Sequence, residues 1–232
     1  MTLETPVVKP DYLKELNVSG RGIAKLDLSP FPALEILHCG NNKLTHLDLS
    51  QNRNLRVLSC FNNQLSEIDL SVNGCLVELY CSNNTLTQLD ISSLGFLRKL
   101  WCFNNRLLRL DLQRSVALNV LFCYNNFLNV IDLSKLTNLQ MLNCRDNRLS
   151  QLDLSFNKDL EILYCSGNQL TSLDLSCTPK LEALYCYRNR IKQLDLSSNC
   201  ALELLYCYGN DLVDLDTSMT QGLRHLRWQG LK

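Results

Sequence analysis

Residues 184–199 read LYCYRNRIKQLDLSSN, and residues 205–218 read LYCYGNDLVDLDTS. Each stretch places a cysteine between two tyrosines, and Cys186 and Cys207 lie 21 residues apart. Nine cysteines keep this step without a slip, at Cys39, Cys60, Cys81, Cys102, Cys123, Cys144, Cys165, Cys186 and Cys207. Self-similarity at a fixed period of this length predicts a solenoid, in which each repeat stacks on the next.

Two leucines, an asparagine and an aspartate follow the same step of 21 residues. Their columns begin at Leu34, Leu37, Asn42 and Asp27, and each continues through nine or ten copies. The period is unbroken, so we expect one elongated array rather than two globular domains.

One repeat shows how such a unit should fold. Residues 120–124 alternate in the manner of a strand, so Leu121 and Cys123 should face the core and the other three residues should face outward. Asn126 should end the strand at a bend, where its amide can bond backbone groups and stacked copies can bond one another. The remaining segment is too short for a helix, so the convex side should consist of turns, extended chain or 3₁₀ pieces.

The pattern L-x-x-L-x-C-x-x-N-x-L-x-x-L-D-L-S resembles the leucine-rich repeat family, with cysteine in place of the third leucine. It is most similar to the 21-residue, cysteine-bearing branch found in bacterial surface proteins of the internalin J type. The resemblance implies a leucine-rich-repeat solenoid of the α/β-horseshoe type, mostly β here. This is a right-handed array with a concave parallel β-sheet. It also implies adhesion or host contact at a cell surface.

Irregular repeats stand at both ends of the array. Val18 and Arg21 replace the cysteine and the asparagine of the first repeat, and Trp228 replaces the cysteine of the last. Terminal repeats of solenoids act as caps. We therefore divide the chain into a lead-in or cap (1–12), ten 21-residue repeats (13–222) and a truncated capping repeat (223–232).

Composition and charge narrow the classes of partner. Lysine plus arginine and aspartate plus glutamate both number 23, so no bulk attraction to nucleic acid or to an anionic membrane is expected. No apolar run approaches the roughly 20 residues that cross a bilayer, so membrane insertion is not expected. Residues 1–12 lack a signal-peptide pattern, so the chain either stays in the cytoplasm or is a mature or trimmed form. By resemblance it is surface-exposed or secreted, and we expect a monomer.

The chain's twelve cysteines do not form the pattern of a metal or disulfide framework. Nine of them should be reduced, buried side chains, whereas Cys75, Cys177 and Cys200 should lie in convex turns. The aspartates should cap local backbone amides, with a calcium ladder as the alternative. No nucleophile motif or phosphate loop is present, so we expect neither an enzyme nor a cofactor.

Aromatic residues gather in the two columns that flank the cysteines, where eleven of the 17 aromatics lie. They form two blocks, which Asn143 and Arg145 interrupt. Rings on an exposed face mark a binding surface, although a ladder that only stabilises the sheet is the alternative. The candidate binding residues are Trp101, Phe103, Phe122, Tyr124, Tyr164, Tyr185, Tyr187, Tyr206, Tyr208 and Arg188.

Charged residues should lie along both edges of the second aromatic block. Glu161, Glu182 and Glu203 form an acidic edge at the strand starts, and Arg188 and Arg190 belong to a basic edge beyond the strand ends. Such edges can orient a partner. We expect a module of a bacterial surface or secreted protein that binds a protein, or less readily a glycan. An intracellular scaffold or delivered effector that uses the same face is the alternative.

Overall fold

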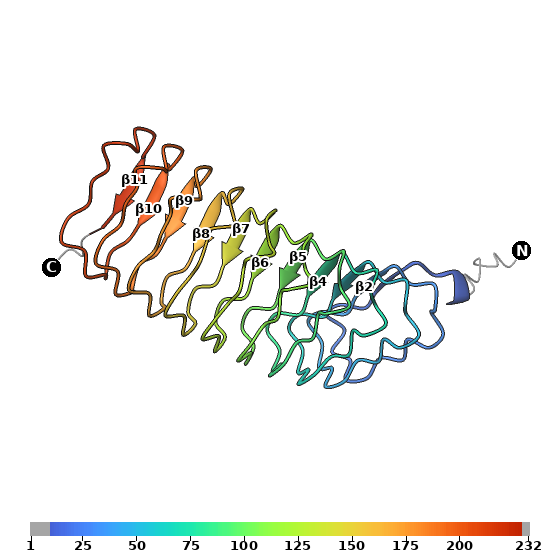
Figure 1. The fold of residues 1–232 in the computed structure, drawn as a ribbon. Helices are drawn as coiled ribbons and strands as arrows, with labels where there is room; N and C mark the ends of the chain where they lie inside the picture. Colours follow the sequence, from blue (N-terminus) through green and yellow to red (C-terminus); the bar gives the residue numbers. More distant parts are fainter. Residues whose placement is uncertain (1–9, 229–232) are drawn as a thin grey trace, which may run out of the picture.

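Each turn of the chain adds one short strand to a single parallel sheet. The computed structural model describes residues 10–228, and its eleven strands lie in the order of the sequence. The strands are β1 (Glu15–Asn17), β2 (Ile36–His38), β3 (Val57–Ser59), β4 (Glu78–Tyr80), β5 (Lys99–Trp101), β6 (Val120–Phe122), β7 (Met141–Asn143), β8 (Ile162–Tyr164), β9 (Ala183–Tyr185), β10 (Leu204–Tyr206) and β11 (His225–Arg227). Figure 1 shows these strands following one another along one side of an elongated, gently twisted stack.

The register of the sheet follows the 21-residue period. Leu121 of β6 pairs with Leu100 on one side and Leu142 on the other, so identical positions lie side by side. We expected a strand over residues 120–124, but β6 ends at Phe122. Backbone hydrogen bonds between repeats nevertheless continue beyond it, and the strand is short because the chain turns at Asn125, whose φ is 53°.

The leucine and cysteine columns form one continuous core. Leu121 and Cys123 are fully buried, whereas Val120, Phe122 and Tyr124 on the opposite face are half-buried, which confirms the predicted alternation. Full burial of a leucine side chain contributes about 1.5–3 kcal/mol. Because the leucines recur at every turn, the core runs the length of the array.

The convex side of the described residues contains turns and extended chain. The one helical element is a 3₁₀ turn, η1 (Pro10–Tyr12), which precedes the first strand. The fold class is therefore confirmed as a leucine-rich-repeat solenoid with a parallel sheet and almost no helix. The irregular first and last repeats each supply a strand, β1 and β11. Their capping role stays a prediction, and residues 1–9 and 229–232 of these segments lie outside the described residues.

The buried asparagine column ties each repeat to the one before it. Asn126 Nδ2 donates to the carbonyl oxygens of Cys123 and Cys102 at 3.0 and 3.1 Å, and its Oδ1 accepts from the Leu107 amide at 2.9 Å. The predicted bonds to the backbone are thus confirmed. The expected bonds between stacked copies occur instead one residue earlier, where Asn125 Nδ2 donates to Asn104 Oδ1 at 2.7 Å.

The aspartate column caps turns on the convex side. Asp153 Oδ1 accepts from the Ser155 amide at 2.9 Å, and the corresponding bond recurs in the other nine repeats that carry this aspartate. The described residues contain no group of three or more His, Cys, Asp or Glu side chains suited to a metal ion. No helix in residues 10–228 is long and apolar enough to cross a membrane.

Candidate functional site

The first aromatic stack covers the middle of the concave sheet. Trp101 lies on Phe122 with ring centroids 5.4 Å apart, and Phe103 lies on Tyr124 with centroids 4.3 Å apart. Tyr80 meets Trp101 edge-on at 4.9 Å, so the stack begins one repeat earlier than the candidate residues indicated. The in-phase register of β4, β5 and β6 brings these rings together.

The second stack covers the C-terminal part of the sheet. Tyr164, Tyr185 and Tyr206 lie in one line, with successive centroids 4.5 and 5.0 Å apart. Tyr187 and Tyr208 lie beside them, 4.8 Å apart and almost parallel. The structure therefore arranges all five predicted tyrosines of this block in two neighbouring stacks, which together we call the tyrosine platform.

The region between the stacks differs from our expectation. Arg145 was predicted to interrupt the rings, but its guanidinium carbon lies 4.6 Å from the centroid of Tyr124 and extends the first stack. A cation over an aromatic face is attracted by the ring quadrupole, which makes this position favourable. Asn143 is buried, and it separates the two stacks.

We expected both flanking columns to face solvent, but their small residues are buried. Ser59, Ser82 and Ser166 expose at most 5% of their surface, and Gly40 is also buried. The ring of Phe61, in the next repeat, lies directly over Gly40. Ser166 Oγ donates to the carbonyl oxygen of Tyr185 at 2.9 Å, so its hydroxyl is satisfied beneath the rings.

The stacked rings are half-buried because each covers its neighbours. A tyrosine hydroxyl is protonated near neutral pH and can donate, and burial raises the pKa of Tyr185 and of Tyr124 further above that range. At the edge of the first stack, the Tyr80 hydroxyl donates to Glu78 at 2.6 Å, and Lys99 pairs with Glu78 at 2.9 Å. This pairing neutralises the carboxylate that lies nearest to the rings.

Arg188 occupies a backbone position that favours other residues. It has a φ of 55°, and the equivalent residues of neighbouring repeats are Gly167 and Gly209. Earlier copies of this position are asparagine or aspartate, the residues that tolerate left-handed backbone best after glycine. Arg188 is exposed, and no carboxylate of the described residues forms an ion pair with it. The sequence carries a signal for this position, because asparagine, aspartate or glycine stands two residues after each of the other columnar cysteines. Our sequence analysis did not identify it as a left-handed position.

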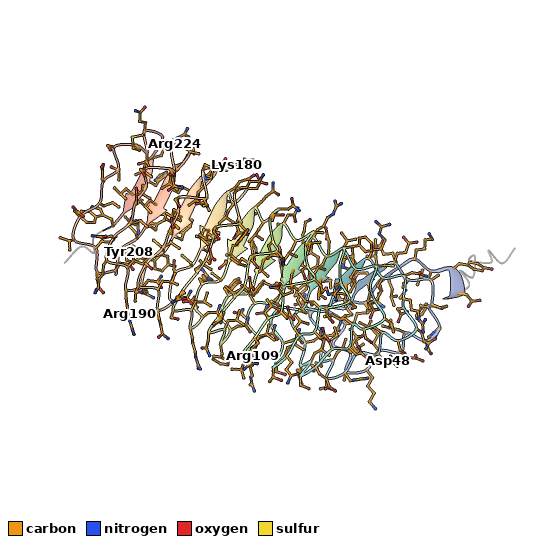
Figure 2. The ribbon with its side chains drawn as sticks, viewed as in Figure 1. Asp48, Arg109, Lys180, Arg190, Tyr208 and Arg224 are labelled. Atoms are coloured by element: carbon orange, nitrogen blue, oxygen red, sulfur yellow. The ribbon has the colours of Figure 1, made fainter. Side chains whose placement is uncertain are left out.

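Charged residues lie along both edges of the second stack. Glu161, Glu182 and Glu203 directly precede β8, β9 and β10, and Glu203 lies 3.7 Å from Arg224. Figure 2 shows Lys180 and Arg224 at the edge where the strands begin and Arg190 at the opposite edge. The acidic edge therefore carries cations as well, which the sequence interpretation did not consider.

A hollow of about 410 Å³ opens at the N-terminal end of the first stack. Sequence reasoning missed it. Its lining residues are His38, Ser59, Phe61, Asn62, Tyr80, Ser82, Asn83, Trp101 and Phe103. The available signal is a pair of serines, Ser59 and Ser82, that interrupt the two aromatic columns in adjacent repeats.

The nine columnar cysteines are free and buried, as predicted, and Cys75, Cys177 and Cys200 are free and exposed. Burial raises the pKa of the Cys144 thiol to about 12, and it raises the pKa of the other eight as well. A protonated, buried thiol is a poor nucleophile, so this column contributes packing rather than chemistry.

Two stretches match family models. Residues 158–199 match the model described as Leucine Rich repeats (2 copies), and residues 75–97 match Leucine Rich Repeat. Neither model points to a catalytic family. A comparison with curated proteins gives no match.

Among solved structures, the chain is similar to the functional domain of InlJ from Listeria monocytogenes, which includes a cysteine ladder. The two are 34% identical with a TM-score of 0.86, and the match covers 94% of this chain and 54% of the InlJ chain. The present chain thus spans about half the length of that relative.

Two further structures share the fold. The internalin InlF from Listeria monocytogenes is 23% identical with a TM-score of 0.85, covering 94% of this chain and 68% of its own, and at that identity it shows the fold alone. The ectodomain of the receptor kinase GASSHO1/SCHENGEN3 from Arabidopsis thaliana, in complex with CASPARIAN STRIP INTEGRITY FACTOR 2, is 26% identical. Its TM-score is 0.72, and the match covers 79% of this chain and 25% of that one. Such resemblances are typical of a protein-interaction module.

Proposed function

Because the chain is an internalin-like protein of the leucine-rich repeat family, we propose that it binds a protein partner through the aromatic rings of its concave face. The observation that carries the proposal is the tyrosine platform of Tyr164, Tyr185, Tyr187, Tyr206 and Tyr208. Its rings are already ordered by stacking, so covering them costs little side-chain entropy. They combine apolar faces with hydroxyl groups that can bond a partner's polar atoms.

A ladder that only stabilises the sheet would not need this distribution. Stacked cross-strand pairs contribute roughly 0.2–1 kcal/mol each, and that gain is available at every repeat. The rings nevertheless stop at Asn143 and Ser166, and Ser82 stands between Phe61 and Phe103. Uneven placement on one face supports recognition, and the exposed Arg188 beside the platform adds a group that can pair with a carboxylate.

We propose that the protein acts at the surface of a bacterium or outside it, in contact with a host; its similarity to InlJ supports this proposal. An intracellular scaffold or delivered effector is the second candidate. The three exposed free thiols, Cys75, Cys177 and Cys200, support it, because reducing compartments preserve such groups. Both candidates use the same concave face.

Site-specific photo-crosslinking tests the proposal. A photoreactive p-benzoylphenylalanine replaces Tyr187 on the concave face or, as the control, Phe156, which is 53% exposed on the convex side. Each protein is irradiated with intact animal cells and, separately, with a cytosolic extract. We expect protein adducts from position 187 that an excess of unlabelled protein suppresses.

The specificity control uses the double variant Tyr185→Ala, Tyr206→Ala as the unlabelled competitor. It should suppress the adducts at least about ten-fold less efficiently than the original protein. Equal adducts from position 156, or equal competition by the double variant, would contradict a concave-face site. Adducts on intact cells support the surface candidate, and adducts confined to the cytosolic extract support the intracellular one.

A further inference from the structure

The hollow beside the first stack lies where the aromatic ladder lacks a ring. Phe61, Ser82 and Phe103 occupy the same position in three consecutive repeats, so a serine stands between two phenylalanines. In the neighbouring column Ser59 stands before Tyr80 and Trp101. The two serines form the floor of the hollow, and the four rings form its walls.

The spacing of the sheet makes this gap the size of one aromatic ring. Adjacent strands lie about 4.8 Å apart, so residues two repeats apart are separated by about 9.6 Å. Rings in adjacent repeats stack at centroid distances of 4.3 Å for Phe103 and Tyr124 and 4.8 Å for Tyr187 and Tyr208. A ring inserted between Phe61 and Phe103 would therefore reach stacking distance of Phe103 and extend the existing stack.

Phe61 leaves this space open because it leans the other way. A Cβ placed on Gly40 would lie 2.8 Å from the ring of Phe61, so the ring passes directly over this glycine. Gly40 belongs to the repeat before Phe61, whereas Ser82 belongs to the repeat after it. The absence of a side chain at Gly40 thus lets Phe61 tilt away from the floor of the hollow.

The lining suits an uncharged, flat group. None of its nine residues is lysine, arginine, aspartate or glutamate, and four are aromatic. Asn62 and Asn83 lie at the rim and are partly satisfied by neighbouring asparagines, since Asn62 Nδ2 donates to Asn41 and Asn83 Oδ1 accepts from Asn104. One polar atom of each rim amide remains for an incoming backbone. Pockets of this volume and apolar character bind small ligands or single anchoring side chains.

We propose that this hollow receives one aromatic side chain of the protein partner, which inserts as the missing ring between Phe61 and Phe103. The inference rests on the proposed function, since it assigns a specific subsite to the concave face. It places an anchoring subsite about four repeats before the tyrosine platform, on the same concave face. The partner would then carry a phenylalanine, tyrosine or tryptophan on an uncharged exposed segment.

A fluorescence titration tests the subsite without the partner. The chain has two tryptophans, so Trp228→Phe leaves Trp101, in the wall of the hollow, as the single reporter. The probes are p-cresol, which mimics a tyrosine side chain, and methyl glucoside, which represents a glycan. We expect a saturable response to p-cresol with a Kd on the order of millimolar.

Matched variants locate the response. Ser82→Phe completes the ladder between Phe61 and Phe103, a position that holds phenylalanine in both adjacent repeats, and should weaken p-cresol binding about ten-fold or more. Ser166→Phe makes the same change in the same column four repeats away and should leave binding unchanged. Gly40→Ala should also weaken binding, because the added methyl group displaces the Phe61 ring toward the hollow.

The outcomes separate the two proposals. No saturable response to p-cresol, or equal binding by the Ser82→Phe and Ser166→Phe variants, would overturn the subsite. Binding of methyl glucoside in place of p-cresol would also overturn it, in favour of a glycan. The crosslinking experiment at position 187 is independent of these results, so the tyrosine platform can stand while the aromatic subsite fails.

Discussion

Tyr187 and Tyr208 stack with ring centroids 4.8 Å apart and planes within 3° of parallel. The distance equals the usual spacing of about 4.8 Å between adjacent strands, so the register of the sheet itself sets it. Rings in phase on a parallel sheet are stacked before any partner arrives. Stability and recognition therefore depend on the same side chains, and the two contributions must be measured separately.

A double-mutant cycle measures the stabilising part of this stack. We expect Tyr187→Ala and Tyr208→Ala to lower the free energy of unfolding and to show a coupling of about 0.5–1.5 kcal/mol in chemical denaturation. The pair Tyr124 and Tyr208 lies four repeats apart and should be additive. Coupling in this distant pair, or additivity in the stacked pair, would show that the rings do not stabilise one another.

Thiol accessibility should divide the cysteines into two classes. In the native protein a thiol reagent should react with the exposed Cys75, Cys177 and Cys200 and spare the nine buried thiols. The raised pKa of the buried thiols, such as that of Cys144 at about 12, slows their reaction further. Mass spectrometry after a timed pulse of the reagent gives the number of labelled thiols. Native labelling of Cys123 at the rate of Cys200 would contradict a packed column.

Replacing a buried cysteine by serine should lower the free energy of unfolding more than replacing an exposed one. Cys123→Ser puts a hydroxyl in an apolar core and should lower the free energy of unfolding by about 1–3 kcal/mol. Cys200→Ser changes an exposed turn residue and serves as the control, with an effect within about 0.5 kcal/mol. Urea denaturation of both variants provides the comparison.

Substitution of two adjacent asparagines should lower the stability to very different extents. Asn126→Ala leaves the Leu107 amide and two cysteine carbonyls without their partner in a buried place, and we expect a loss of about 2–4 kcal/mol. Asn125→Gly suits the left-handed φ of 53° and removes one hydrogen bond to Asn104, so it should cost under about 1 kcal/mol. Equal losses in thermal unfolding would mean that the buried amide is not the link between repeats.

The periodic features were predictable because the sheet repeats them. Leu121, Cys123 and Asn126 obey a period of 21 residues and an alternation of two, and both patterns follow from backbone geometry alone. The rows of rings were predictable for the same reason, since columns in phase must lie side by side. Whether a partner uses them stays a prediction.

The features missed by sequence reasoning depend on how side chains lean across repeats. Arg145 was expected to break the stacks, yet its long side chain reaches back over Tyr124. Ser82 was expected to face outward like its column neighbours, yet it is buried at the floor of the hollow. Rotamers of this kind depend on the neighbours in both directions along the stack, which a single repeat does not specify.

Acid should weaken the convex turns. Hydrogen bonds from the serine two residues later lower the pKa of nine aspartates of the column, including Asp153. A carboxyl group whose pKa is lower in the folded state stabilises the fold above its unfolded pKa of about 3.9, and this contribution is lost as pH falls through the folded value. The Tm should be nearly constant from about pH 7 to 5 and fall below about pH 4. Replacing Asp132, Asp153 and Asp174 together by asparagine should make the decrease in Tm at low pH smaller. An unchanged dependence of Tm on pH below about pH 4 would contradict the capping role.

Arg188 should lower the stability of the fold and contribute to binding of the partner. Its φ of 55° costs an ordinary residue about 1–2 kcal/mol, whereas glycine pays no such steric penalty and asparagine a smaller one. Arg188→Asn should therefore raise the free energy of unfolding by about 0.5–1 kcal/mol, as measured by chemical denaturation. In the crosslinking competition the same variant should be a weaker competitor, because the guanidinium group beside Tyr187 and Tyr208 is gone. Gly209→Asn provides the matched control, since it introduces asparagine at the same position of the next repeat and leaves Arg188 in place. A variant at position 188 that is more stable and competes as well as the original protein would show that the strained arginine serves no binding role.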